Sequence, residues 1–379
     1  MKKITIAILI QILFISTIAF AQKDYPNKVD GYFLINNFPF QSGETTLPQL
    51  KIHYITFGKP LKDQNGTVTN AVLIMHGTGS NSRGFLNSQF AGVLFGKGQL
   101  LDANKYYIIL PDGVGHGKSS KPSDGLHMKF PKYTYDDMVL IYYRLLTEHL
   151  GVNHLRLTTG TSMGGMHTWM FGYQYPGFSD ALLPLASLPV SLAGRNRMMR
   201  KMAINLIEAD PEWKGGEYTT SPVQGLMGAG SSLFFMGSSP LQLQKKAPTR
   251  QQADDLVAAM QKGYAKMDAN DLIYQLEASR NYDPSPYLDK IKAPLFAINS
   301  ADDQINPPEL GIMEQEIKKV PKGRYILLPI TDKTQGHGTN SLPAIWGNYL
   351  KELLAASQSG THYKINPVNY NPFTMSSDF

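Results

Sequence analysis

The sequence predicts an α/β fold in which a mostly parallel central sheet is flanked by helices and interrupted by an inserted helical cap. Short apolar segments alternate with segments of helical periodicity, the order expected for parallel strands joined by helices. Between about Leu192 and Arg280 the strand signals vanish and helical ones replace them. With 379 residues, 42% of them hydrophobic, the chain can form one large core and a subdomain.

The N-terminus predicts a secretory signal peptide over residues 1–21. Two lysines precede an apolar run that begins at Ile4, and an A-x-A site at residues 19–21 stands before Gln22. This order is typical of a cleaved signal. The alternative is an uncleaved anchor, because the 18 residues from Ile4 to the A-x-A site can span a membrane. We expect cleavage, export to a periplasm or the medium, and no stable membrane insertion of the mature chain.

Composition excludes several classes of site and partner. The chain has no cysteine, so it can form neither a disulfide nor a thiolate nucleophile. Its net charge of +6 comes from Lys and Arg residues spread along the chain, which argues against a nucleic-acid partner. The nine histidines are scattered, with no Cys/His cluster at zinc spacing, and the glycine-rich segment 112–119 lacks the spacing of a phosphate-binding loop. We expect no metal and no cofactor.

The core is expected in two parts, residues 22–191 and residues 286–357, with the helical cap over residues 192–285. A loosely attached tail, residues 358–379, follows. The predicted elements of the core are β-rich runs within 32–57, strands at 71–77, 106–111 and 154–159, helices at 135–150 and about 165–175, and strands at 294–299 and 324–330.

The stretch TTGTSMGGMHTW, residues 158–169, carries the main chemical signal. Gly160-Thr161-Ser162-Met163-Gly164 fits G-x-S-x-G between a predicted strand and a predicted helix, the context that a nucleophile turn requires. Gly160 and Gly164 are needed because a Cβ two residues before or after the serine would collide with neighbouring backbone. A flexible glycine turn with an incidental serine is the simpler alternative. We predict that Ser162 is a nucleophile because an acid and a histidine follow downstream.

The predicted acid is Asp303, in the loop after the buried strand PLFAIN. Asp302 competes directly, but Asp303 has the D-x-x-x-P spacing to Pro307 and sits one place deeper in the loop. Asp283 and Asp332 fit less well, since one is at the cap junction and the other is too close to the histidine strand.

The predicted base is His337, after the strand RYILLPI and between two glycines. His76, His116 and His167 are alternatives that we expect to be structural. The order serine, acid, histidine is the one in which this type of sheet presents a triad. His337 would take the proton of Ser162, and Asp303 would fix the tautomer of its ring.

An oxyanion hole is predicted from the segment His76-Gly77-Thr78-Gly79, which follows a buried strand and matches an H-G-x loop. The backbone N–H groups of Thr78 and Met163 would bind the developing oxyanion. We expect His76 to brace this loop rather than to react.

These motifs resemble the α/β-hydrolase fold and, within it, the homoserine O-acetyltransferase-like family. The resemblance extends from about His53 to Leu350. It rests on the segments VLIMHG, LFGKGQLLDANKYYII, FPKYTYDDMV, GTSMGGMHTWMFGYQYP, IEADPEWKGGEY, NYDPSPYL and DDQINPP. The resemblance implies a Ser162, Asp303, His337 triad beneath a helical cap, and a homodimer formed through that cap.

The chain departs from this family at residues 225–244. Members that use homoserine carry arginines there, thought to hold the amino acid's carboxylate, whereas this segment has no charged residue. A buried carboxylate without a partner is costly, so homoserine is a doubtful substrate. Three arginines elsewhere in the cap could supply a charge, although we expect them to be solvated: Arg195, Arg197 and Arg200.

We therefore expect an exported serine hydrolase of esterase type that acts on a small, largely uncharged ester. An enzyme outside the cytosol would not meet acetyl-CoA, and water can replace an alcohol as the acyl acceptor. The alternative is an O-acyltransferase of the homoserine O-acetyltransferase type. A binding protein on the same scaffold is disfavoured, because the triad positions and the H-G-x loop are all present.

Overall fold

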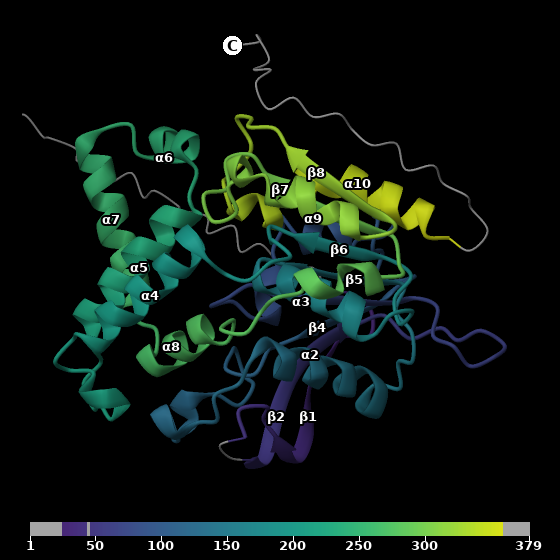
Figure 1. Ribbon diagram of the computed structural model, residues 1–379, viewed down its shortest axis with the longest axis horizontal. Coiled ribbons are helices and arrows are strands. Elements are labelled where there is room, and N and C mark those ends of the chain that lie inside the picture. Colours follow the sequence, from purple (N-terminus) through teal and green to yellow (C-terminus); the bar gives the residue numbers. More distant parts are fainter. Residues whose placement is uncertain (1–24, 44–45, 359–379) are drawn as a thin grey trace, which may run out of the picture.

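Residues 25–43 and 46–358 are described by the computed structural model (Figure 1). The predicted signal peptide and the predicted tail beyond residue 358 lie outside these residues. Within the described ranges, no helix is long and apolar enough to cross a membrane.

An eight-stranded sheet forms the centre of the molecule, in the order β1-β2-β4-β3-β5-β6-β7-β8. β1 and β2 form a long antiparallel pair, β2 is antiparallel to β4, and all other neighbours are parallel. The strands are β1 Val29–Pro39, β2 Thr46–Phe57, β3 Ala71–Met75, β4 Tyr107–Pro111, β5 Leu157–Thr161, β6 Leu182–Leu185, β7 Leu295–Ser300 and β8 Gly323–Leu328. The predicted fold class is confirmed, and the carboxyl ends of the parallel strands meet at one edge.

Helices cover both faces of the sheet (Figure 1). In β3, Leu73 and Met75 pack in one core cluster with residues of α2 and α3, whereas Val72 and Ile74 pack in a second cluster with residues of α1 and α10. This alternation is the period of two that a strand imposes on its side chains. The helices concerned are α1 Ala91–Leu94, α2 Tyr135–Arg144, α3 Met163–Gln174 and α10 Pro343–Ala356. A further helix, α9 Ile312–Glu316, packs with residues of α3, β6 and β7 in another cluster.

Five helices lie between β6 and β7 and form a separate group beside the sheet (Figure 1). They are α4 Gly194–Glu208, α5 Val223–Gly237, α6 Pro240–Lys246, α7 Arg250–Tyr264 and α8 Ala269–Glu277. Apolar residues of α4, α5 and α8 make a small core of their own, while α6 and α7 bury no residue fully. The predicted cap segment thus contains helices and no strand of the sheet.

Two predicted elements differ most from the structure, and one strand of the sheet was not predicted. The strand expected over 154–159 is β5, Leu157–Thr161, because its pairing with β3 and β6 continues into the glycine motif. The helix expected over 135–150 is α-helical only to Arg144 and continues as a π turn, Leu145–His149. The four-residue strand β6 was not predicted, since Pro184 interrupts an already short apolar run.

Candidate active site

Ser162 lies in the turn between β5 and α3 with a positive φ of 55° and a ψ of −111°. A non-glycine residue in such a conformation costs about 1–3 kcal/mol, so its surroundings must hold it there. A Cβ atom on Gly160 would lie 2.4 Å from the carbonyl carbon of Gly164, and one on Gly164 would lie 2.0 Å from the carbonyl oxygen of Met75. Both positions require glycine for the turn to pack against the sheet.

His337 and Asp303 lie in line with this serine. The Nε2 atom of His337 is 2.8 Å from the Oγ atom of Ser162, and its Nδ1 atom is 2.8 Å from an Oδ2 atom of Asp303. The three side chains come from loops after β5, β7 and β8, which end at the same edge of the sheet. This is the geometry in which a histidine can accept a proton from a hydroxyl while a carboxylate fixes its tautomer.

Asp303 is fully buried, yet its environment favours the charged form. Burial would raise the pKa of this carboxyl. The charge of His337 and its hydrogen bond, together with hydrogen bonds from Asn306 and the backbone N–H of Ile305, outweigh burial and hold the pKa below its ordinary value. The carboxylate therefore remains ionised at neutral pH and can stabilise a positive charge on His337.

Asn306 is a residue that the sequence reasoning missed. Its Nδ2 atom donates to Asp303 Oδ2 at 3.1 Å and to the carbonyl oxygen of Ala186 at 3.0 Å, so it orients the oxygen that faces His337. Its place three residues after Asp303 was the available signal, because side chains at that spacing in a tight loop can bond one another.

The competing carboxylate Asp302 points elsewhere. It accepts a hydrogen bond from the hydroxyl of Ser300 and one from the backbone N–H of Gly336. The structure thus brings Asp303, and not Asp302, against the ring of His337.

The loop after β3 passes directly beside the serine. A Cβ atom on Gly77 would lie 3.3 Å from the Cβ of Ser162, and Thr78 lines the same cavity as Ser162 and His337. Met163 is the first residue of α3, so its N–H has no acceptor within the helix. Both residues thus lie next to Ser162: Met163 follows it in the chain, and Thr78 lines the cavity in front of it.

The cavity in front of Ser162 has a volume of about 250 Å³. Among the described residues, no lysine, arginine or carboxylate lines it, and two phenylalanines form its apolar part. The lining residues are Gly77, Thr78, Ser80, Gly84, Phe85, Phe90, Thr161, Ser162, His337, Gly338, Asn340 and Ser341. Such a surface suits a small uncharged group.

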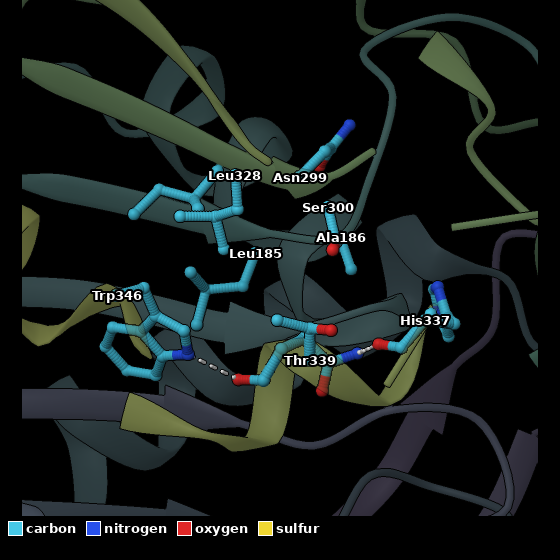
Figure 2. Close-up of a pocket in the computed structure, with 11 residues that line it drawn as sticks. Leu185, Ala186, Asn299, Ser300, Leu328, His337, Thr339 and Trp346 are labelled. Atoms are coloured by element: carbon cyan, nitrogen blue, oxygen red, sulfur yellow. Dashed lines mark hydrogen bonds between the residues drawn. The ribbon is translucent and has the colours of Figure 1, made fainter. Parts of the chain in front are cut away.

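A second, much smaller cavity of about 10 Å³ lies behind His337 (Figure 2). Trp346 donates from Nε1 to the carbonyl oxygen of Asn340, and Asn340 donates from Nδ2 to the carbonyl oxygen of His337. These bonds, dashed in Figure 2, tie the loop of His337 to helix α10.

The three histidines considered as alternatives to His337 are structural: His76, His116 and His167. His76 accepts a hydrogen bond from the N–H of Gly113 and is in contact with the carbonyl oxygen of Gly77, which confirms that it braces the loop. Burial lowers the pKa of His76, lowers that of His116 to about 3, and lowers that of His167 well below its ordinary value. All three are neutral at physiological pH.

The cap arginines do not line the cavity. Arg195 bonds Gln304, and Arg197 pairs with Glu277. The expectation that Arg200 is solvated is wrong: it is buried and donates to Asn196 and to the carbonyl oxygen of Leu276, in the last turn of α8 where carbonyls lack helical partners. Across residues 25–43 and 46–358, no group of His, Asp and Glu side chains could hold a metal ion.

Comparisons with known proteins agree with this architecture. Residues 70–329 match the family model described as alpha/beta hydrolase fold. The chain belongs to the α/β-hydrolase fold family. A probable acyltransferase of Methanothermobacter thermautotrophicus is 29% identical over 313 residues, which cover 82% of this chain and 93% of that protein.

One further sequence relative and one solved structure of the same fold carry different names. A homoserine O-acetyltransferase of Haemophilus influenzae is 28% identical over 297 residues, 69% of this chain and 80% of its own length. An acetylester hydrolase from Corynebacterium glutamicum has a similar structure, with a TM-score of 0.74 and 21% identity over 86% of this chain and 96% of that one. The resemblance to the homoserine O-acetyltransferase-like family is confirmed, and hydrolysis and acyl transfer both occur on this fold.

Proposed function

We propose that this α/β-hydrolase is an exported serine hydrolase of esterase type, with Ser162 as nucleophile, His337 as general base and acid, and Asp303 as the orienting carboxylate. The observation that carries the proposal is the hydrogen-bonded line from Asp303 through His337 to Ser162, on a strained turn that opens into a cavity.

In the first half-reaction, Oγ of Ser162 attacks the ester carbonyl while Nε2 of His337 takes its proton. The N–H groups of Thr78 and Met163 bind the oxyanion, a contribution of about 3–4 kcal/mol per donor in related chemistry. The imidazolium then protonates the leaving alcohol, which leaves an acyl group on Ser162. The charge of Asp303 stabilises the imidazolium throughout.

In the second half-reaction, His337 activates the acyl acceptor, which we propose is water. Three features support water. The cavity lacks a cation for an amino-acid carboxylate, residues 225–244 of the cap carry no charge, and the N-terminus has the pattern of an exported protein. The Met-rich cap would then serve as an adaptable apolar lid over a small ester.

Acyl transfer to an alcohol is the second candidate. It is favoured by the sequence relatives, which are named as acyltransferases and match most of this chain. The same triad can pass an acyl group to an alcohol or to water, so the acceptor depends on what the site binds and excludes.

Turnover of a short p-nitrophenyl ester by residues 22–379 distinguishes the two candidates. If the protein is an esterase, the amounts of nitrophenol and of free acid released are equal, with or without homoserine. Formation of O-acylhomoserine at the expense of free acid would establish the acyltransferase. Ser162→Ala is the control in both cases and should abolish turnover while leaving the thermal unfolding transition intact.

Export is tested separately. Expression of the full chain, followed by cell fractionation and N-terminal sequencing, should place a protein that begins at Gln22 outside the cytoplasm. A full-length chain in the cytosol would contradict this part of the proposal.

A further inference from the structure

Two adjacent carboxylates lie buried in the loop after β7, and only one of them touches the triad histidine. Asp302 is 5% exposed and Asp303 is fully buried. Asp302 accepts a hydrogen bond of 2.5 Å from Ser300 Oγ and one of 2.9 Å from the N–H of Gly336. No ion pair involves Asp302 in the described part of the chain. Burying a carboxylate without a cation is costly, so the hydrogen bonds from Ser300 and Gly336 must stabilise the Asp302 side chain in this position.

Gly336, whose N–H donates one of these bonds, directly precedes His337. It has a φ of 59°, and a Cβ atom there would lie 2.6 Å from the carbonyl oxygen of Ser238, in the turn between cap helices α5 and α6. Gly336 is therefore confined between the cap on one side and Asp302 on the other. Removing the carboxylate would leave a buried N–H without an acceptor, one residue away from the triad.

We propose that Asp302 is a positioning residue that sets the orientation of the His337 ring through the N–H of Gly336. This inference rests on the proposed function, since it concerns the same triad. The two neighbouring carboxylates then have different roles. Asp303 must be charged, because it faces the ring that becomes an imidazolium, whereas Asp302 need only accept a hydrogen bond at a fixed point.

These different roles predict that an amide is tolerated at position 302 but not at position 303. In Asp302→Asn, the amide oxygen can accept from Gly336 while the amide nitrogen donates to the hydroxyl of Ser300, so both contacts survive. In Asp302→Ala both are lost. We expect Asp302→Asn to keep kcat within about threefold of the wild type, and Asp302→Ala to lower kcat on the order of tenfold to a hundredfold with KM unchanged, as misplacement of a catalytic group does.

The experiment measures kcat and KM for a short p-nitrophenyl ester, thermal unfolding, and the downfield proton NMR signal of the His337 Nδ1–H that bonds Asp303. Asp332→Asn, which changes an exposed carboxylate in the loop after β8 that also carries Gly336 and His337, is the matched control and should behave as the wild type. The NMR signal should persist in Asp302→Asn and be lost or displaced in Asp302→Ala. If Asp302→Ala does not fold, Ser300→Ala, which removes one anchor of the carboxylate, should lower kcat less but in the same way.

Several results would overturn the proposal: equal losses for Asn and Ala at position 302, a loss explained by KM, or a wild-type kcat with an unchanged signal in Asp302→Ala. Failure of the proposed function looks different, because Ser162→Ala would then turn over esters as fast as the wild type. Even in that case the NMR signal of His337 tests whether Asp302 positions the ring.

Discussion

Replacing Asp303 by asparagine preserves the size of the side chain, but an NH₂ group that donates hydrogen bonds takes the place of one oxygen that accepts them. One oxygen of Asp303 accepts from the backbone N–H groups of Ile305 and Asn306, at 2.8 and 3.2 Å. The other accepts from His337 Nδ1 at 2.8 Å and from the Asn306 side chain at 3.1 Å. Every neighbour of the carboxylate is thus a donor.

An amide has one oxygen, and two backbone donors compete for it. If that oxygen stays with Ile305 and Asn306, the new NH₂ group faces His337. The ring must then present Nδ1 as an acceptor and carry its proton on Nε2, next to Ser162 Oγ. In that tautomer it cannot take the serine's proton, and the charge that would stabilise the imidazolium is also gone. The expected loss is about 10⁴ in kcat, roughly 5.5 kcal/mol at 1.36 kcal/mol per tenfold change.

Steady-state hydrolysis of a short p-nitrophenyl ester at neutral pH measures this loss, with Asp302→Asn as the matched control. The Asp303 variant should lose far more activity than the control, and KM should change little in either. The opposite ranking would move the acid to Asp302. Near wild-type kcat in the Asp303 variant would refute the tautomer argument altogether.

Further predictions concern the turn, the fold and its pH dependence. Gly164→Ala should lower the free energy of unfolding in urea by 3 kcal/mol or more, roughly the upper end for overpacking, because its Cβ would lie 2.0 Å from the Met75 carbonyl oxygen. Gly263→Ala, a helical glycine with nothing within 4 Å, should instead stabilise by about 0.5–1 kcal/mol, and equal effects would contradict this packing argument. Burial would lower the pKa of His53, but hydrogen bonds to Asp112 and Asp30 outweigh it and raise the pKa above the ordinary value of 6.5. The folded state therefore binds this proton more tightly than the unfolded state. The resulting stability is present below pH of about 6.5 and is lost as pH rises through the raised pKa. Relative to His53→Gln, the wild type should lose unfolding free energy as the pH rises above about 6.5, and parallel curves would exclude a charged His53.

The nucleophile turn was the most predictable part of the site. The spacing of G-x-S-x-G is local in sequence, and its two glycines have no alternative because a Cβ atom at either would collide with backbone. His337 and Asp303 followed because residues just after parallel strands gather at one sheet edge. These signals need only the order of elements along the chain.

The contacts that hold the triad were not predictable from the sequence. The bond from Gly336 to Asp302 joins backbone to side chain across 34 residues, and nothing local distinguishes Asp302 from a solvated neighbour. The prediction for Arg200 was wrong for the same reason. The sequence of its own helix does not show that the C-terminal end of α8 packs over this side chain and accepts a hydrogen bond from it. Such contacts depend on how loops and helices pack, which periodicity does not specify.

The most direct test of the central claim is to trap the acyl group during turnover. Rapid acid quenching of residues 22–379 with a p-nitrophenyl ester, followed by peptide mass spectrometry, should find one acyl group on the peptide that contains Ser162, and none in Ser162→Ala. An acyl group on another residue, or full turnover with no acylated peptide, would contradict the assignment of Ser162 as the nucleophile.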